Sequence, residues 1–252
     1  RSSYSGIGIL KSSDKGKTWE NLGLPESHHI SRILVNPKNN NEIIVGVTGH
    51  LYTKNKERGI YKTLDGGKTW KKRICDSSIV VAEGEANFAA SNSNIAVYKK
   101  HCWIATGGKK ARVFYSADFG ETWTNYEVPI IQGEQMTGIY SIDFYDENLG
   151  FVIGGDWNNK NSFSKNKAIT TDGGKTWSLV ADEKYPGYRS CVKFDPNGNG
   201  AKLMAVGPTG ISESLDSGKT WNHISDSGFY AVGFSPSGNT IWMSGKNKVV
   251  KY

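Results

Sequence analysis

Short apolar runs of strand length, each followed by a polar turn, recur along the whole chain. One stretch holds the runs "SRILVNP", "EIIVGVTG" and "GIYKTLD", and a later stretch holds "YRSCVKFDP", "KLMAVGPTG" and "ISESLDSG". Turns such as "NPKNNN", "YDENLG", "DPNGNG" and "SPSGN" join two runs of a set. Short runs separated by turn residues favour β-strands over helices. The pattern predicts an all-β fold of antiparallel strands.

An eight-residue segment at the end of such runs occurs five times, as "SSDKGKTW", "TLDGGKTW", "SADFGETW", "TTDGGKTW" and "SLDSGKTW". Every copy has an acid, a glycine two residues later, and then a Thr-Trp pair. The acids are Asp14, Asp65, Asp118, Asp172 and Asp216. They are separated by about fifty residues, a period typical of stacked or circular repeat folds.

The residue types of this segment predict a turn. The Asp carboxylate accepts hydrogen bonds from backbone N–H groups just downstream, and the glycine supplies a positive φ at low steric cost. The Trp places a large ring beneath the turn. Because the spacing from acid to glycine never changes, we predict a structural role for the five acids and a buried Trp under every turn.

The segment matches the Asp-box, or BNR, signature, and chains that carry it resemble the β-propellers of sialidases, sortilin-type receptors, glycosidases and assembly factors. This resemblance implies four-stranded antiparallel blades, with the box between the third and fourth strands and away from the usual ligand face. Residues 8–72 resemble glycosidase and sortilin-like repeats, through "GILKSSDKGKTWENLGLPESHHISRILVNP", "VTGHLY" and "ERGIYKTLDGGKTW". Residues 83–252 resemble bacterial and plant propellers labelled oxidoreductases and related to photosystem II assembly factors, through "EGEANFAAS", "TGGKKARVFYS", "GIYSIDF", "GGDW", "YRSCVKFDP", "AVGPTG" and "SGFYAVGFSP".

The two ends of the chain look complementary. The first stretch supplies "GIGILKSSD" and "TWENLG", a third and a fourth strand, whereas the last supplies "FYAVGFSP", "TIWMSGK" and "KVVKY" without a box. We expect the termini to pair in one composite closing blade, which makes residues 1–252 a single propeller domain of five blades. "KVVKY" and "GIGILK" compete for the same position. Residues 73–82 join the two repeat styles, and a fusion or a deleted blade there would explain the junction. If blades are missing, the parent propeller has six or seven blades.

Composition excludes several classes of protein. The net charge is +7, but the lysines recur at one position of the repeat, as Lys17, Lys68, Lys175 and Lys219, so the charge is distributed and nucleic-acid binding is not expected. No apolar run is long enough to span a membrane. Cys75, Cys102 and Cys191 are an odd set, for which we expect free thiols. The chain opens at Arg1 without a Met, which favours a processed or trimmed N-terminus.

Enzyme signatures are weak. Arginines are few and the Arg-Ile-Pro motif of sialidases is absent, which argues against sialidase activity. No G-x-G-x-x-G motif follows a strand, so the oxidoreductase label is discounted. The sequence "DPNGNGAKLMAV" begins like a calcium loop but has Val206 where the last carboxylate belongs. We therefore expect no cofactor and no metal. Glu83, Glu85, Asp143 and Asp156 are the carboxylates that a glycosidase would have to pair across an open cleft, and we expect that no two of them face each other at about 5–10 Å.

The best candidate site is the mouth of the central channel, opposite the boxes. Its loops are rich in Tyr, Trp, Glu and Arg, residue types that bind sugars or peptides. The ligand-binding candidates are Glu83, Glu85, Arg112, Tyr140, Asp156, Trp157, Tyr188, Arg189 and Tyr230. We expect Arg112 or Arg189 to neutralise at least one of the carboxylates, because an unpaired buried carboxylate is costly.

These observations lead to two hypotheses of function. The first is a non-catalytic binding or assembly propeller that recognises a protein segment or a glycan at the mouth. The alternative is a glycoside hydrolase of sialidase-like or xyloglucan-active type. We also expect a monomer in the bacterial periplasm, on the cell surface or secreted, since the box is common in exported propellers and no Asn-x-Ser/Thr acceptor occurs.

Overall fold

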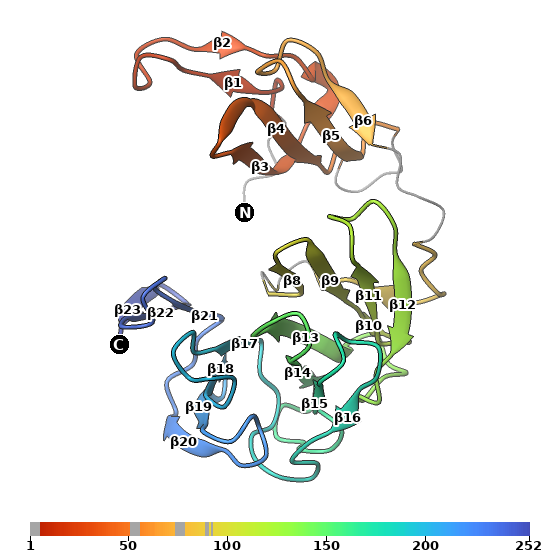
Figure 1. The fold of residues 1–252 in the computed structure, drawn as a ribbon, viewed down its shortest axis with the longest axis vertical. Helices are drawn as coiled ribbons and strands as arrows, with labels where there is room; N and C mark the ends of the chain where they lie inside the picture. The colour runs from red at the N-terminus through yellow and green to blue at the C-terminus, as the bar shows by residue number, and fades with distance from the viewer. Residues whose placement is uncertain (1–5, 51–55, 74–78, 89–90, 92) are drawn as a thin grey trace. The chain divides into compact units, whose positions relative to one another are not determined.

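The computed structural model describes residues 6–50, 56–73, 79–88, 91 and 93–252, among which strands dominate and no α-helix forms (Figure 1). The chain divides into two compact units, Arg1–Cys75 and Asp76–Tyr252. Their boundary falls inside residues 73–82, where the two repeat styles were expected to meet. The all-β prediction is confirmed.

The first unit contains a four-stranded antiparallel sheet, β3-β4-β5-β6, a two-stranded ladder, β1-β2, and one 3₁₀ turn. Its elements are β1 (Leu10–Lys11), β2 (Glu20–Asn21), η1 (Pro25–Ser27), β3 (Ile30–Asn36), β4 (Asn39–Val47), β5 (Gly59–Thr63) and β6 (Lys71–Arg73). Ile43, Val45 and Val47 alternate along β4 and are buried on one face of the sheet. They form the core of this unit.

The second unit consists of antiparallel sheets that follow one another along the chain. The first is β8 (Ile95–Tyr98), β9 (His101–Ala105), β11 (Arg112–Ser116) and β12 (Thr124–Glu127). The second is β13 (Thr137–Phe144), β14 (Gly150–Asp156), β15 (Lys167–Thr170) and β16 (Ser178–Leu179), to which β7 (Glu85–Ala86) and β10 (Gly107–Gly108) add short ladders beside β13. The third is β17 (Cys191–Phe194), β18 (Leu203–Gly207), β19 (Gly210–Ser214) and β20 (Asn222–Ser225), and the last has three strands, β21 (Ala231–Phe234), β22 (Ile241–Gly245) and β23 (Lys248–Lys251).

Neighbouring sheets of the second unit pack face to face, and each contact holds its own apolar cluster. Trp103 and Ile142 belong to the cluster between the first two sheets, Phe151 and Val192 to the next, and Met243 to the last. A sheet that lies between two others is buried on both faces, so its strands read as nearly continuous apolar runs. The strand β14 shows this, because all of its residues except its last are buried.

The five box turns share one hydrogen-bonding scheme, and the predicted turn role is confirmed. In the copy at Asp172, Oδ1 accepts from the backbone N–H of Thr176 at 2.9 Å and from the Thr170 hydroxyl at 2.8 Å, while Oδ2 accepts from the Thr176 hydroxyl at 2.7 Å. The backbone N–H of Gly174 donates to the Thr170 hydroxyl at 3.0 Å. The same four bonds recur at Asp14, Asp65, Asp118 and Asp216.

The box glycine is required by packing as well as by backbone conformation. Gly174 has φ +88°, and a Cβ at this position would lie 3.2 Å from the ring of Trp103 in the preceding sheet. At Gly218 the Cβ would lie 2.3 Å from Phe151, again a residue of the preceding sheet. The positive φ could be predicted from the sequence, but the close approach of a large side chain could not.

The Trp of each box lies where predicted, but its burial varies. Trp177 is 8% exposed and donates its indole N–H to the Gly174 carbonyl at 2.9 Å. Trp19 makes the equivalent bond to Gly16 at 3.1 Å and is 60% exposed. The expectation that every box Trp is buried is therefore confirmed only for Trp177. Trp70, Trp123 and Trp221 are half-buried, and Trp19, whose adjoining ladder β1-β2 has only two strands, is exposed.

Replacing Asp172 with Ala is expected to lower the free energy of unfolding by about 1–3 kcal/mol at pH 7, because several donors lose their acceptor. Burial alone would raise the pKa of Asp172, but hydrogen bonds from Thr176 and Thr170 hold it below its ordinary value of 3.8. A lowered folded-state pKa stabilises the fold above the unfolded pKa, and this stabilisation is lost as the pH falls through the folded value. In urea titrations the difference between wild type and variant should therefore shrink below about pH 4. A difference that stays constant to pH 2 contradicts the role of the ionised carboxylate.

Candidate ligand-binding site

The box turn and the candidate loops lie at opposite ends of the same sheet. Asp156, the last residue of β14, pairs with Thr137 at the start of β13, whereas Phe144 at the other end pairs with Gly150. The box turn contacts the latter end, where the Gly173 N–H donates to the Asn148 carbonyl at 2.9 Å. We call the end marked by Thr137 and Asp156 the distal end.

Three of the predicted site residues gather in one aromatic cluster at the distal end of the second unit. Tyr140 stacks on Phe88 with ring centroids 4.1 Å apart, and Tyr188 packs edge-on against Tyr140 at 4.7 Å. Trp157 packs edge-on against Tyr188 at 5.4 Å, and the Lys160 ammonium lies 4.3 Å from the Trp157 ring centroid. Phe88 and Lys160 were not among the predicted site residues, although Phe88 stands in the stretch "EGEANFAAS".

The cluster is buried at one side and open at the other. Tyr140 and Tyr188 are 6% and 2% exposed, and burial raises the pKa of both hydroxyls above the ordinary value. Trp157 is 36% exposed, so it brings the aromatic surface to solvent. An aromatic face beside an ammonium group offers stacking and charge together, which suits a peptide or a sugar.

Glu85 and Arg112 form a closed ion pair. The Glu85 side chain is completely buried, and its oxygens accept hydrogen bonds from the Arg112 guanidinium, from the Thr106 hydroxyl at 2.6 Å and from the Ala82 N–H at 2.7 Å. Arg112 also donates to Asn125 Oδ1 at 3.0 Å. Burial would raise the pKa of Glu85, but the bonds from Arg112 and Thr106 hold it below its ordinary value. The prediction that an arginine neutralises one of the candidate carboxylates is confirmed.

Arg189 is 1% exposed and is held by hydroxyl and carbonyl oxygens. Its guanidinium donates to Ser212 Oγ at 2.8 Å, Thr209 Oγ1 at 2.6 Å and the Tyr185 hydroxyl at 2.9 Å. Lys167 is also 1% exposed, and burial lowers its pKa to about 7. Both cations underlie the distal loops and hold them in place through main-chain and hydroxyl acceptors.

The carboxylates Asp143 and Asp156 lie at opposite ends of one sheet. Asp143 pairs in register with Phe151, six residues along β13 from Thr137, which corresponds to about 20 Å of strand. Lys193 Nζ lies 2.6 Å from Asp143, and Asp156 accepts from the Asn158 N–H at 2.8 Å. The register of β13 and β14 puts Asp143 at the box end, so the expectation that these two carboxylates do not face each other is confirmed.

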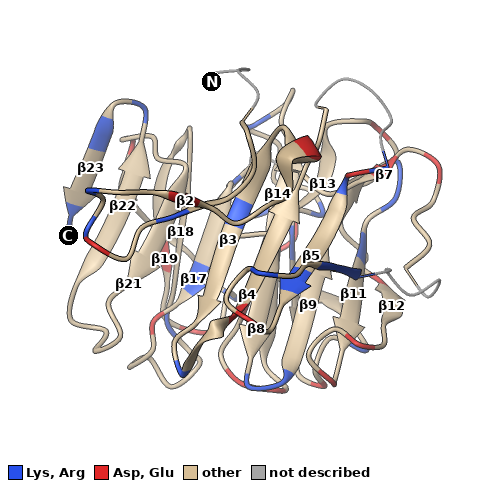
Figure 2. Ribbon diagram, turned by 90° about the horizontal axis from the view of Figure 1, so that it is seen from above, with Lys and Arg blue, Asp and Glu red and all other residues tan. Residues whose placement is uncertain are grey.

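The remaining candidates are exposed. Glu83 lies on the surface, and Tyr230 is 51% exposed. Basic and acidic segments are interspersed along the strands and turns (Figure 2).

Of the cysteines that the structure describes, Cys102 is half-buried and Cys191 is buried, and both are free; Cys75 lies outside the described residues.

Among the residues that the structure describes, no group of three or more His, Cys, Asp or Glu side chains is placed to hold a metal ion. No helix in the same part of the chain is long and apolar enough to cross a membrane.

Comparison with known proteins supports the repeat and the fold. Residues 8–132 match the Sortilin-Vps10 family (sortilin, neurotensin receptor 3), and residues 168–179 match the BNR/Asp-box repeat. The structure is similar to that of the GH74 enzyme of Niastella koreensis, with a TM-score of 0.61 and 18% identity over 97% of this chain and 38% of that one. The chain is an Asp-box β-propeller.

Two further solved structures resemble this propeller. An ancestral GH74 enzyme has a TM-score of 0.59 and 16% identity, covering 99% of this chain and 34% of that one. YCF48 bound to a D1 peptide has a TM-score of 0.50 and 19% identity, covering 90% and 64%. No curated protein matches the sequence. The propeller spans less than two thirds of each of these structures, and at such identities the likeness shows the fold alone.

Proposed function

We propose that this propeller is a non-catalytic binding or assembly protein that takes a protein segment or a glycan at the distal end of its second unit. The observation that carries the proposal is the aromatic cluster, which presents Trp157 beside Lys160 on a base of buried tyrosines. A rigid, half-exposed aromatic side chain is a common anchor for ligands. YCF48, which shares the fold, is known with a D1 peptide bound, and this supports a protein segment as one class of ligand.

Glycoside hydrolysis is the alternative, suggested by the GH74 enzymes that share the fold. Retaining and inverting mechanisms both need two carboxylates about 5–10 Å apart across an open cleft. Glu85 is enclosed by Arg112 and Thr106, and Asp143 binds Lys193 at the far end of the sheet from Asp156. The enclosure of Glu85 and the separation of Asp143 from Asp156 favour binding over hydrolysis.

Replacing Trp157 with Ala is expected to weaken ligand binding about tenfold or more, because the exposed anchor of the aromatic cluster is lost. Capture of partners from the native organism and binding to a glycan array measure this effect. The matched control is Phe119→Ala, which removes an aromatic side chain that is 74% exposed at the box end. Loss of binding in the control but not in Trp157→Ala would contradict the proposed site.

The proposal includes a single propeller of five blades closed by the two termini. The ladder β1-β2 and the sheet β21-β22-β23 together hold five strands, one more than a four-stranded blade needs. Two engineered disulfides test the closure, one between β1 and β22 and one between β2 and β23, for the two strands that compete for the third position. Failure of both to form contradicts the closure. We further propose a monomeric protein located in the periplasm, on the surface or outside of a bacterial cell, which gel filtration and cell fractionation test.

A further inference from the structure

The first strands of three successive sheets of the second unit lie side by side, with β13 in contact with both β8 and β17 (Figure 1). Beside the turns that follow these strands at the box end lies an open pocket of about 490 Å³. Its lining comes from Tyr98 of β8, from residues 143–146 of β13 and its turn, and from Phe194 and Pro196 of β17 and its turn. This volume lies within the range of about 300–1,000 Å³ in which proteins hold small ligands.

The box-end pocket has aromatic walls from three sheets. Tyr145 packs on Phe194 with ring centroids 5.9 Å apart and an interplanar angle of 57°, so these two rings meet at a corner. Tyr98 comes from the third sheet, and the Lys99 ammonium lies 5.1 Å from its ring centroid. Phe194 is buried, whereas Tyr98 and Tyr145 are half-buried and keep apolar ring surface open to a ligand.

Free hydrogen-bonding groups accompany these rings. Among the described residues, neither the Tyr98 nor the Tyr145 hydroxyl has a hydrogen-bond partner, and each can donate one bond and accept two. Asp146 Oδ1 accepts from the N–H groups of Asn148 and Leu149 at 2.7 Å each. These bonds hold the carboxylate in place and leave its other oxygen available to a donor on a ligand.

The charges around the pocket nearly cancel. Asp143 Oδ1 lies 2.6 Å from Lys193 Nζ, and its Oδ2 accepts from a backbone N–H at 2.8 Å, so this carboxylate is compensated. Near Asp146 lies the Lys99 ammonium, whose pKa is raised by its bond to Glu147 at 3.0 Å and, less strongly, by the charge of Asp146. Neither an anion nor a cation gains much from this balance, whereas a neutral ligand with hydroxyl groups finds partners.

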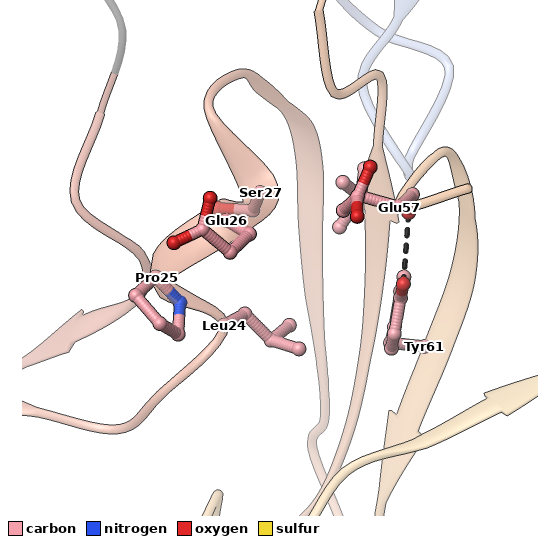
Figure 3. Close-up of a pocket in the computed structure, with 7 residues that line it drawn as sticks. Leu24, Pro25, Glu26, Ser27, Glu57 and Tyr61 are labelled. Carbon is pink, nitrogen blue, oxygen red and sulfur yellow. Dashed lines mark hydrogen bonds between the residues drawn. The ribbon is translucent and has the colours of Figure 1, made fainter. Parts of the chain in front are cut away.

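A pocket of about 230 Å³ in the first unit provides a contrast (Figure 3). Its surface is almost wholly apolar. The Tyr61 hydroxyl there already donates to the Glu57 carbonyl at 2.8 Å, the Ser27 side chain is buried, and the Glu26 side chain is 77% exposed to solvent. A ligand with many hydroxyl groups therefore finds fewer partners there than in the box-end pocket.

We propose that the box-end pocket binds a neutral pyranose ring. The C–H face of the sugar packs on the Tyr145 ring, one sugar hydroxyl donates to Asp146 in a charge-assisted bond, and the tyrosine hydroxyls exchange bonds with others. The compensated Asp143 anchors the wall beside them. Because this pocket and the aromatic cluster of Trp157 lie at opposite ends of the unit's sheets, the pocket is a second site that does not depend on the function proposed above.

An NMR titration of the full chain with the methyl glycosides of glucose, galactose, mannose and xylose tests this site, with guanidinium and acetate as charged probes. We expect saturable shifts of residues 98, 143–146 and 194–196 with at least one glycoside, at a Kd on the order of 1 mM, and weaker binding of both charged probes. No saturable shift of these residues with any glycoside, or equal or tighter binding of a charged probe, overturns the proposal.

The source of the sugar and the independence of the site are read in the same titration. A tetrasaccharide of the sugar that binds distinguishes the sources: tighter binding than the methyl glycoside indicates a glycan chain, and equal or weaker binding indicates a free sugar. Shifts of residue 157 report binding at the distal end separately, so each site stands or fails by its own signals.

Two variants and a matched control separate binding from folding. Tyr145→Phe should weaken glycoside binding about threefold without lowering the thermal midpoint, because the lost hydroxyl has no partner among the described residues. Asp146→Asn keeps an acceptor for the turn but removes the charge, and should weaken binding about tenfold. In the control Tyr126→Phe, a half-buried tyrosine of β12 outside the pocket loses its hydroxyl, and binding should be unchanged. Unchanged affinity in both pocket variants, or an equal loss in Tyr126→Phe, contradicts the assignment.

Discussion

Replacing Arg112 with Met is expected to lower the free energy of unfolding by about 3–5 kcal/mol, because it leaves the buried Glu85 carboxylate without its counter-charge. Without the opposing charge, burial raises the pKa of Glu85 in the variant. The loss in the free energy of unfolding should therefore be smallest at acidic pH, where the carboxyl is neutral. Urea unfolding at pH 7 and at pH 4 measures both effects. A variant within about 0.5 kcal/mol of wild type at pH 7 would show that the pair contributes nothing.

The double variant Arg112→Met with Glu85→Leu is the control for this prediction. Removing both charges removes the uncompensated carboxylate, so the double variant should regain much of the lost stability. If it is as unstable as Arg112→Met, the loss comes from other contacts of the arginine, such as the bond to Asn125.

The second large effect is expected at Trp103, which joins two neighbouring sheets. Its ring is fully buried in β9, stacks on Phe144 of β13 with centroids 3.6 Å apart, and donates its indole N–H to the Gly173 carbonyl at 2.8 Å. Trp103→Ala should cost about 3–5 kcal/mol, the usual range for a buried aromatic residue replaced by Ala.

Trp103→Phe separates ring packing from the hydrogen bond. It keeps most of the stacking surface and leaves the Gly173 carbonyl without this donor, so we expect a loss of about 1 kcal/mol. Denaturant midpoints of the two variants give the comparison. Equal losses of unfolding free energy in the two variants would mean that the hydrogen bond, and not the packing between sheets, accounts for most of the contribution of Trp103.

Local features of this fold could be predicted from the sequence because they depend on residues a few positions apart. The bonds of Asp172 reach only from Thr170 to Thr176, so the repeated segment contains all of its own partners. The strand runs between the boxes were visible for the same reason. By contrast, Trp103 belongs to no box, and its contact with Gly173 spans seventy residues of sequence. Only the packing of neighbouring sheets reveals it.

The candidate site was harder to predict because composition does not separate exposed from buried members. Tyr188 and Trp157 both come from aromatic-rich loops, yet one is 2% and the other 36% exposed. Glu85 and Arg112 were chosen as ligand-binding candidates, and the structure encloses them in a pair because β7 and β11 come together only in the folded unit. The position of Asp143 at the box end could not be predicted, since a strand's register is unknown until its partner strand is known.

The most direct test of a binding propeller without catalysis is turnover. Xyloglucan and sialyllactose are incubated with the full chain and the release of reducing ends and of sialic acid is measured, with heat-denatured protein as the blank. We expect no release above the blank, because Glu85 is paired with Arg112, Asp143 with Lys193, and Asp143 lies at the opposite end of its sheet from Asp156. Release that Asp156→Asn or Glu83→Gln abolishes would contradict it and establish the hydrolase.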